Sequence, residues 1–535
     1  MQPVFVLFGT ESGNAQSLAK RAGEALAKAG LPAKVIDMMD FAGPDLEKLE
    51  RLLVITSTYG NGDPPSNAEA LHAFLMKKCP PLPRLSFSVC ALGDTTYDHF
   101  AKCGRDFDER LGALGATRLV DRQDCDVDYD DPFDAWLARV TQTLVELATP
   151  RAAATASAPP PSVDMPSLET PVGLDEPGTR RNPVVLRVID NRRLGGEGSQ
   201  KRVHHVALST AGAPLPFAPG DSIGLWAEND PALVEAVAKA GAVALDARVT
   251  LGGLDTTLRD ALTRRLEIQH VDVRLVEVLR GPLPNEERQA LIERSHVVDL
   301  LEASPKKLSP AELVDHLRPL APRLYSVASS PRAYPGEVHL MVDILEYQLS
   351  GTRRWGVASK QIAERLPVGS MIPAYLHKTP SFRLVPAPTR IVMIGPGTGL
   401  APFRAFLQER KLDGAKRSAW LFSGARSRAH DYFYGDELEA YAREGTLAHL
   451  DLAFSRDQAD KRYVQHRMLE RGRELAAWIA EGAVIYVCGN ASRMAPDVHE
   501  ALVSILRTHL GKTDANARAE LAAMAESGRY QRDVY

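Results

Sequence analysis

The chain has 535 residues, 44% of them hydrophobic and 25% charged, with a formal net charge of −4. These proportions are typical of a globular protein of two to four domains and exclude a disordered or fibrous chain. No apolar run reaches the ~18 residues that span a bilayer, and the N-terminus has no basic leader, so we expect a cytoplasmic protein without a membrane anchor. The cysteines form no C-x-x-C pair, so neither a disulfide framework nor a metal site is expected: Cys79, Cys90, Cys103, Cys125 and Cys488.

Residues 1–149 alternate short apolar strands with amphipathic helices. We predict strands near 3–8, 33–37, 52–56, 86–92 and 117–120, and helices over 14–29, 67–77, 99–114 and 132–147. The first helix has one apolar face, made of Ala15, Leu18, Ala19, Ala22 and Leu26. Five strands alternating with helices predict a doubly wound parallel sheet, whose ligand site lies at the carboxyl ends of the strands.

Three loops at that edge of the sheet favour a flat phosphorylated ligand. The loop from Gly9 to Ala15, GTESGNA, follows the first strand and opens a helix, which suits an anion. It lacks the lysine of a Walker loop, so it predicts a single phosphomonoester without a metal ion. The loops after the third and fourth strands carry Tyr59 and Tyr97, and two such rings can sandwich a flat ring. The alternative is a set of surface turns with incidental tyrosines.

Charge is unevenly distributed along the chain. The first 150 residues carry 15 Lys+Arg against 22 Asp+Glu, whereas the rest of the chain carries 49 against 46. Twelve of the acids in the first part fall between Asp94 and Asp134. This run is either a solvated acidic face or a docking surface for a basic protein partner. Nothing in the sequence suggests nucleic-acid binding.

Residues 150–181 are rich in Ala, Pro, Ser and Thr and predict a flexible linker. Beyond it, residues 182–385 contain β-rich segments at 182–226, 323–347 and 370–376, interrupted by a more helical stretch at about 231–318. Residues 386–535 return to alternating strands and helices. We therefore predict a second nucleotide-binding α/β domain at the C-terminal end.

Several motifs in this second half favour dinucleotide chemistry. RLYS, Arg323 to Ser326, offers an arginine for a pyrophosphate and a tyrosine for a ring face. GVAS, Gly356 to Ser359, opens a helical pattern and offers an anion loop. GPGTGLAPF follows an apolar strand from Gly395, with G-x-G-x-G spacing instead of the usual G-x-G-x-x-G.

The stretch AFSRDQADKRYVQ suits a 2′-phosphate, because Arg and Lys take the place of the acid that NAD-dependent proteins put on the ribose. Its polar residues are Ser455, Arg456, Lys461, Tyr463 and Gln465. The alternative is an ordinary cluster of charges at the start of a helix.

Together these features identify a family. The N-terminal loops resemble the FMN site of a flavodoxin, and RLYS, GVAS, GPGTGLAPF, FSGAR, AFSRDQADKRYVQ, YVCG and RDVY resemble the ferredoxin–NADP reductase module. The whole chain resembles the NADPH-dependent diflavin reductases. This implies a flavodoxin-like domain joined to an antiparallel β-barrel FAD domain with a helical connecting insert, followed by an α/β NADPH domain.

The resemblance also implies the cofactors FMN, FAD and NADPH and assigns residues to them. The implied FMN contacts are Thr10, Glu11, Ser12, Gly13, Asn14, Ala15, Tyr59, Gly60, Leu92, Gly93, Asp94, Tyr97, Phe100 and Asp126. The implied FAD contacts are Arg323, Leu324, Tyr325, Ser326, Tyr347, Gly356, Val357, Ala358 and Ser359. The implied NADPH contacts are Gly397, Thr398, Arg426, Ser455, Arg456, Lys461, Tyr463, Gln465, Asp497 and Tyr535. Ser326, Cys488, Asp533 and Tyr535 are implied at the site of hydride transfer.

In this family electrons pass from NADPH to FAD, then to FMN, and then to a separate haem or iron–sulfur protein. DPALVEAV and the C-terminal RYQRDVY are most similar to the sulfite reductase branch, which implies the sulfite reductase haemoprotein as acceptor, docking on the acidic FMN domain. The main alternative is a soluble NADPH–cytochrome reductase. A non-catalytic, flavin-bound electron carrier is the alternative from another functional class.

Overall fold

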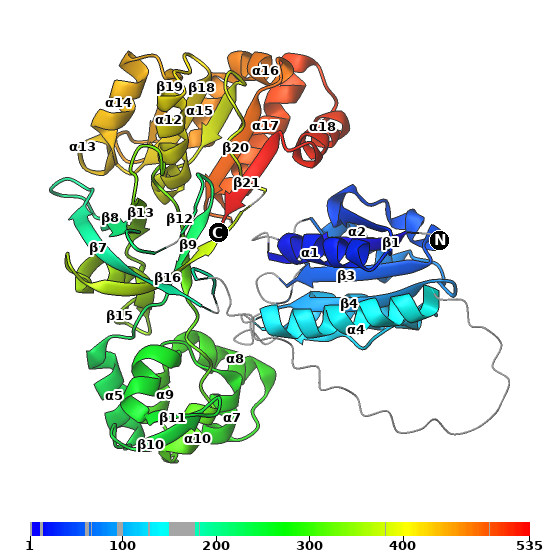
Figure 1. The fold of residues 1–535 in the computed structure, drawn as a ribbon, viewed down its shortest axis with the longest axis vertical. Coiled ribbons are helices and arrows are strands. Elements are labelled where there is room, and N and C mark those ends of the chain that lie inside the picture. The colour runs from blue at the N-terminus through cyan, green and yellow to red at the C-terminus, as the bar shows by residue number, and fades with distance from the viewer. Residues whose placement is uncertain are drawn as a thin grey trace. The chain divides into compact units, whose positions relative to one another are not determined.

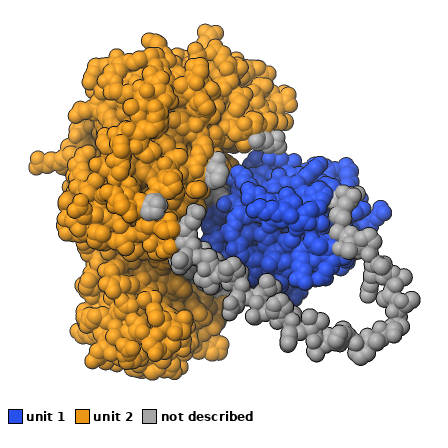
Figure 2. Space-filling view, viewed as in Figure 1, with its two compact units in different colours: residues 1–175 blue, residues 176–535 orange. Residues whose placement is uncertain are grey.

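The computed structural model describes residues 3–535 apart from 11–13, 59–61, 63, 66, 94–99, 127–128, 149–176, 181, 214, 380 and 492. The chain divides into two compact units, Met1–Asp175 and Glu176–Tyr535 (Figures 1 and 2). Across the described residues, no helix combines the length and the apolar character needed to cross a membrane.

Unit 1 is a parallel sheet in the order β2-β1-β3-β4-β5. Its four long strands match the predicted positions: β1 (Val4–Gly9), β2 (Ala33–Asp37), β3 (Arg51–Ser57) and β4 (Ser86–Leu92). The fifth strand predicted at 117–120 is present but shorter than predicted, and a second short strand follows it. Two short pieces, β5 (Thr117–Arg118) and β6 (Gln123–Cys125), both pair with β4, and between them the Ser88 hydroxyl donates to the Val120 carbonyl.

Helices cover both faces of this sheet. The predicted apolar face of α1 (Asn14–Lys28) is buried, and it packs in one hydrophobic cluster with α4 (Asp130–Ala148). On the other face α2 (Glu69–Lys77) and α3 (Lys102–Ala113) pack in a second cluster together with the short helices η1 (Met38–Asp40) and η2 (Gly43–Lys48). The order 2-1-3-4-5 reverses direction between β1 and β3, and ligands bind at such a point in open α/β sheets.

The first part of unit 2 is an antiparallel barrel. Its strands run in the order β12-β9-β16-β7-β8-β13, and a bridge between Val327 and Leu340 joins the two ends of this path. The six strands are β7 (Val184–Arg193), β8 (Val203–Ser209), β9 (Ser222–Leu225), β12 (Arg323–Ser326), β13 (Glu337–Asp343) and β16 (Met371–His377). A hairpin, β14 (Glu346–Leu349) and β15 (Thr352–Trp355), leads into α11 (Val357–Lys360) and η4 (Gln361–Arg365).

The insert is mostly helical, as predicted, but it also contains a hairpin that the sequence pattern did not predict. Its helices are α5 (Pro231–Gly241), α6 (Leu258–Asp260), η3 (Ala261–Arg265), α7 (Val273–Arg280), α8 (Asn285–Arg294), α9 (Val297–Glu302) and α10 (Pro310–Asp315). The hairpin joins β10 (Arg248–Leu251) to β11 (Leu254–Thr257). Gly252 and Gly253 form its turn with φ of 57° and 78°, a conformation in which glycine meets no Cβ clash.

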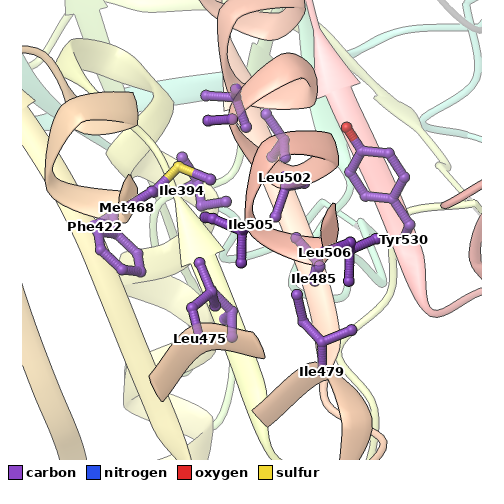
Figure 3. Close-up of a cluster of buried hydrophobic side chains, with 14 of the residues drawn as sticks. Ile394, Phe422, Met468, Leu475, Ile479, Ile485, Leu502, Ile505, Leu506 and Tyr530 are labelled. Carbon is purple, nitrogen blue, oxygen red and sulfur yellow. The ribbon is translucent and has the colours of Figure 1, made fainter. Parts of the chain in front are cut away.

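The C-terminal part of unit 2 is a parallel sheet in the order β19-β18-β17-β20-β21. Its strands are β17 (Ile391–Ile394), β18 (Ala419–Ala425), β19 (Leu447–Phe454), β20 (Val484–Gly489) and β21 (Tyr530–Val534). One face packs against α15 (Val464–Glu470), α16 (Gly472–Ala480), α17 (Met494–Leu510) and α18 (Asp514–Glu526). Figure 3 shows this core, in which Ile394 and Ile485 of the sheet meet Leu502, Ile505 and Leu506 of α17.

The other face of this sheet carries η5 (Gly397–Leu400), α12 (Ala401–Leu412), α13 (Arg428–Asp431) and α14 (Gly435–Arg443). Helix α12 packs in one cluster with the barrel residues Val203, Ala328 and Met341, so the barrel and the sheet share a hydrophobic core. The chain ends on β21, which pairs in parallel with β20 and was not predicted as a strand.

A buried polar network crosses the same contact. Arg404 of α12, 4% exposed, donates to Glu437 (2.8 Å) and to the Ala328 carbonyl (2.7 Å). His339 lies edge-on to His205 at 4.8 Å between ring centroids. A buried charge of this kind is tolerated only where it is paired, so the network fixes how α12 sits on the barrel.

Candidate active site

The described part of the first site lies at the carboxyl ends of β1, β3, β4 and β6. The Thr10 amide donates to the Asn67 side-chain oxygen (2.8 Å), and Asn67 in turn donates to Asp37 at the end of β2 (2.8 Å). A Cβ on Gly9 would stand 2.5 Å from the Thr56 hydroxyl, so the β1 loop leaves the sheet in close contact with β3. Asn67 was not predicted, although it lies in the loop after β3 whose tyrosine the sequence pattern indicated.

The loop after β4 is held just as closely. The Gly93 amide donates to the Cys125 carbonyl (2.9 Å), and a Cβ on Gly93 would stand 2.6 Å from the Ala101 nitrogen and 2.8 Å from the Phe100 ring. Leu92 ends β4 and Asp126 follows β6, while Asn14 and Ala15 begin α1, so these predicted residues share one sheet edge. The predicted residues Glu11, Ser12, Gly13, Tyr59, Gly60, Asp94 and Tyr97 lie outside the described residues.

The second site begins on β12 at the edge of the barrel. Arg323 and Leu324 are exposed, and Leu324 exposes 45% of its surface. Tyr325 is half-buried, and burial raises the pKa of its phenol. Leu345, which precedes β14, is 59% exposed. Exposed leucines at a barrel edge give an apolar surface that a flat ring can cover, and the Arg323 guanidinium adds a cation beside it.

The hairpin and the loop after it supply the rest of this site. The Tyr347 hydroxyl lies 2.9 Å from His296 Nε2 of the insert. Gly356 caps α11, which contains Val357 and Ala358, and a Cβ on Gly356 would stand 3.0 Å from the Ser359 hydroxyl. Ser359 Oγ accepts from the Leu345 amide (3.1 Å), so the predicted anion-binding hydroxyl also holds the backbone of the loop.

The four residues implied in hydride transfer come together where the barrel meets the C-terminal sheet. Ser326 Oγ donates to Asp533 Oδ2 (2.7 Å), and the Cys488 thiol lies 3.7 Å from the same oxygen. Cys488 and Asp533 are register partners in β20 and β21. Burial raises the pKa of Asp533 and of Cys488. The Tyr535 amide donates to the Gly489 carbonyl (3.0 Å).

The β17 loop approaches this group of residues closely. A Cβ on Gly399 would stand 2.1 Å from the Cys488 carbonyl, so only glycine fits there. Gly397 has φ of +61°, the left-handed region that favours glycine. Thr398, between them, has its hydroxyl 3.0 Å from the Tyr535 hydroxyl. The glycine loop therefore touches β20 where the strand order reverses, which is the expected ligand position.

The predicted 2′-phosphate residues follow β18 and β19. The amides of Ser455 and Arg456 donate to the carbonyls of Ala425 and Arg426, which holds the two loops together. Arg456 Nη1 donates to the side chain of Gln200, from the loop between β7 and β8 (2.7 Å). No sequence pattern indicated Gln200, because it lies 256 residues away along the chain.

The other predicted 2′-phosphate residues lie at the start of α15, and a pocket lies at the same sheet edge. Gln465 donates to Asp497 of α17 (2.9 Å), while Lys461 is exposed and Tyr463 is 44% exposed and stacks on His466. Because Tyr463 and His466 cap α15, the helix-start alternative describes part of this cluster. This small pocket is lined by Gly397, Leu400, Ser423, Gly424, Ala425, Asp431, Tyr432, Phe433, Leu452 and Phe454.

Comparison with known protein families matches three segments of the chain. Residues 6–136 match the flavodoxin family, residues 283–361 an FAD binding domain, and residues 393–500 an oxidoreductase NAD-binding domain. The matched segments contain, in turn, the β1 loop, the hairpin with the GVAS loop, and the glycine loop of β17.

Full-length relatives are similar over 99% of this chain. The sulfite reductase (NADPH) flavoprotein alpha-component of Bacillus subtilis is 41% identical, with 89% of that protein covered. The proteins of the same name from Cronobacter sakazakii and Zymomonas mobilis are 38% and 37% identical, with 90% and 89% of their lengths covered.

Proposed function

The chain belongs to the family of sulfite reductase (NADPH) flavoprotein alpha-components, and from this premise we propose that it delivers electrons from NADPH to a separate haemoprotein that reduces sulfite, with the cytoplasm as its place of action. It is an NADPH-dependent oxidoreductase whose cofactors are FMN, FAD and NADPH. When bound, NADPH supplies two electrons to FAD as a hydride, and the two flavins pass them on singly.

The observation that carries the proposal is the convergence of Ser326, Cys488 and Asp533 at the barrel edge. The Ser326 proton points at the Asp533 carboxylate, which leaves the serine oxygen free to accept from a ligand. A carboxylate in a poorly solvated position favours a positive charge nearby, and a nicotinamide ring gains such charge as it loses hydride. These three residues are therefore assigned to orienting the nicotinamide and stabilising its oxidised form.

The neighbouring residues are assigned to binding and orienting FAD and the nicotinamide of NADPH. Tyr325, half-buried on β12, is assigned to one face of the flavin ring, and Arg323 to the FAD pyrophosphate. Tyr535 is 58% exposed and makes its side-chain contact with Thr398, so its ring can leave without disturbing a core. In this proposal Tyr535 covers the flavin until the nicotinamide replaces it.

FMN is assigned to the sheet edge of unit 1, where the chain would hold it through the β1 loop. The Gly9 contact with Thr56 and the Asn67 bridge between Thr10 and Asp37 fix the start of that loop. The amides at the start of a helix suit a phosphate group, and α1 begins at Asn14, directly after this loop. The acceptor protein is assigned to the same unit, because electrons leave the chain from FMN.

The acidic face assigned to docking is partly neutralised within unit 1. Arg21 pairs with both Asp130 (2.7 Å) and Asp134 (2.5 Å). Asp108 pairs with Arg118 at 2.9 Å. The exposed Arg21 pairs are screened by salt, whereas Asp108 is buried, and all of these pairs lower the negative charge that a basic partner would meet.

The test is to mix the purified chain with sulfite reductase haemoprotein and follow sulfide formation from sulfite and NADPH. Sulfide formation supports the proposal, whereas rapid cytochrome reduction without sulfide would favour the soluble cytochrome reductase. Turnover should fall as salt rises, because charge attraction sets the encounter rate. Neutralising Asp128, Asp130 and Asp131 together should slow electron transfer to the haemoprotein. It should not slow the reduction of ferricyanide, because that small acceptor needs no docking. Arg21→Gln, which exposes more negative charge, should have the opposite effect on the haemoprotein.

A further inference from the structure

The hydroxyl of Tyr347 is engaged by a histidine that comes from a different part of the fold. Tyr347 lies on β14 of the hairpin, and its oxygen is 2.9 Å from Nε2 of His296, the residue before α9 of the insert. His296 is 2% exposed, so the contact is shielded from solvent. The family resemblance assigned Tyr347 to FAD and gave His296 no role.

The surroundings of His296 determine which ring nitrogen carries the proton. Burial, followed by the charge of Arg354, lowers the pKa of His296 to about 4, so the ring is neutral at pH 7 and has one N–H. Nδ1 is buried without a hydrogen-bond partner. The His296 ring also faces the backbone N–H of Asp299, as in a capping box. That N–H is a hydrogen-bond donor.

A proton on Nδ1 would therefore be a buried, unpaired donor facing another donor. Burying such a group removes an N–H from water without replacing its hydrogen bond, which destabilises the folded state. With the proton on Nε2, the ring donates to the Tyr347 oxygen, and the unpaired Nδ1 carries only a lone pair, which is less costly to bury than an unpaired N–H. Once the tyrosine oxygen accepts this bond, its own proton points to a different acceptor.

The charged groups around His296 are fixed by the same contact between the insert and the hairpin. Arg354 of β15 pairs with Asp299 (2.6 Å), and Glu267 pairs with His270 (3.5 Å), whose ring centroid is 6.2 Å from that of His296. Burial also raises the pKa of Tyr347, so its hydroxyl keeps its proton.

The insert holds the rest of the hairpin as well. Gln269 donates to the Trp355 carbonyl (2.7 Å), and the Ser350 hydroxyl donates to the Arg294 carbonyl (2.7 Å). Trp355 is followed directly by Gly356 and the loop assigned to FAD. Tyr347 and that loop therefore belong to one segment, and the insert fixes both of its strands.

We infer that His296 is a positioning residue for FAD binding: its Nε2–H donates to Tyr347 Oη and thereby directs the Tyr347 hydroxyl proton toward an acceptor oxygen of the bound flavin nucleotide. The inference rests on the proposed assignment of Tyr347 to FAD. It gives the helical insert a part in cofactor binding through one hydrogen-bonded pair, in addition to its connecting role.

The test compares two isosteric variants of His296 in the full chain after removal of FAD. In His296→Gln the amide nitrogen reaches the position of Nε2, whereas in His296→Asn it reaches only that of Nδ1. FAD affinity, measured by quenching of flavin fluorescence, should stay within about 2-fold of the parent for Gln and weaken about 3- to 10-fold for Asn, the range of one hydrogen bond. His316→Asn, in a histidine near the end of α10, is the matched control and should leave the affinity unchanged.

Tyr347→Phe separates this inference from the assignment on which it rests. It should weaken FAD binding by a similar 3- to 10-fold, and adding His296→Asn should then cause little further loss. Full FAD affinity in Tyr347→Phe would overturn the assignment of Tyr347 to FAD and the inference with it. Equal losses from His296→Asn in both backgrounds, or equal losses for Gln and Asn, would overturn the inference alone, because a merely structural histidine acts without the tyrosine.

Discussion

Ser326 Oγ donates a hydrogen bond to Asp533 Oδ2 across 2.7 Å and so joins β12 of the barrel to β21 at the end of the chain. The two residues are 207 positions apart, and nothing in either segment requires the bond. It depends on the C-terminal strand adding to the edge of β20, which places Asp533 beside Cys488. In the proposed function the C-terminal segment therefore belongs to the reaction site, because Tyr530–Val534 form a strand and do not trail into solvent.

The first prediction concerns the cost of keeping Asp533 ionised. Burial raises its pKa, so between its unfolded and folded values the native chain binds more protons than the unfolded one, and stability falls as pH rises through that window. At neutral pH Asp533→Asn should therefore raise the melting temperature of unit 2 while it slows flavin reduction by NADPH. The gain should shrink as pH is lowered toward 4, as calorimetry can measure.

Asp246→Asn, in an exposed turn before β10, is the control and should change neither quantity. A loss of stability in Asp533→Asn at neutral pH would contradict the assignment of a destabilising buried carboxylate.

The second prediction concerns coenzyme preference. Arg456 is assigned to the 2′-phosphate, and charge-assisted bonds are worth roughly 1.5–3 kcal/mol. Arg456→Ala should raise the Michaelis constant for NADPH about ten- to a hundredfold and leave that for NADH nearly unchanged. Arg462→Ala is the matched control, because Arg462 pairs with Glu470 instead. Equal losses with both coenzymes would remove Arg456 from the phosphate site.

The two parallel sheets could be predicted from the sequence because their central strands are buried on both faces. All four residues of β17 are buried, and an apolar run of that kind followed by a glycine loop is typical of a central strand in a parallel sheet. Strand β21 was missed since YQRDV has little apolar character, and it is held by pairing with β20. The hairpin in the insert was missed because helices dominate the surrounding pattern, although Gly252-Gly253 is a recognised turn signal.

The side-chain contacts within the sites were less accessible to sequence reasoning. Motifs indicated which loops meet at a sheet edge, but not which side chains orient the ligand-binding ones. The hydrogen bond that Arg456 donates to Gln200 and the one between His296 and Tyr347 link segments that are 256 and 51 residues apart. Such pairs depend on how the barrel, the insert and the C-terminal sheet pack, and no local pattern records that packing.

The third prediction concerns acid sensitivity. Burial, then the neighbouring His339 and Arg404, lowers the pKa of His205 to about 3. Since an unfolded histidine titrates near 6.5, this group contributes stability that is present above pH 6.5 and lost as pH falls toward 3. Between pH 7 and 5 the loss should be about 2 kcal/mol from His205 alone.

Urea unfolding of unit 2 at the two pH values measures this loss. His205→Gln should be less stable than the parent at pH 7, because the contact of His205 with Tyr434 is disturbed, but it should lose about 2 kcal/mol less on acidification. His316→Gln should behave like the parent. An unchanged pH dependence in His205→Gln would show that another group titrates in this range.

The fourth prediction concerns the packing of α3 on β4 in unit 1. A Cβ on Gly104 would stand 2.2 Å from the Ala91 Cβ and 2.9 Å from the Ala91 Cα, so the helix would have to move away from the strand. Gly104→Ala should destabilise unit 1 by about 1–3 kcal/mol. The variant should lose FMN and keep FAD. The ratio of FMN to FAD released from it should therefore fall below the one-to-one value expected of the parent. Ala113→Ser, at the exposed end of the same helix, should leave the ratio unchanged.

The last prediction concerns Tyr535. Its backbone is tied to the loop after β20 by the bonds from its amide to Gly489 and from the Ala491 amide to its carbonyl, so Tyr535→Ala removes the ring without freeing the terminus. In the proposed mechanism the ring must leave before the nicotinamide can bind. Removing it should therefore tighten the binding of oxidised coenzyme and narrow the preference for NADPH over NADH. Thr398→Val, which removes only the hydroxyl contact at 3.0 Å, should shift both quantities in the same direction by less. Isothermal titration with NADP⁺ and steady-state kinetics with both coenzymes test this, and an unchanged preference in Tyr535→Ala would remove the ring from the nicotinamide site.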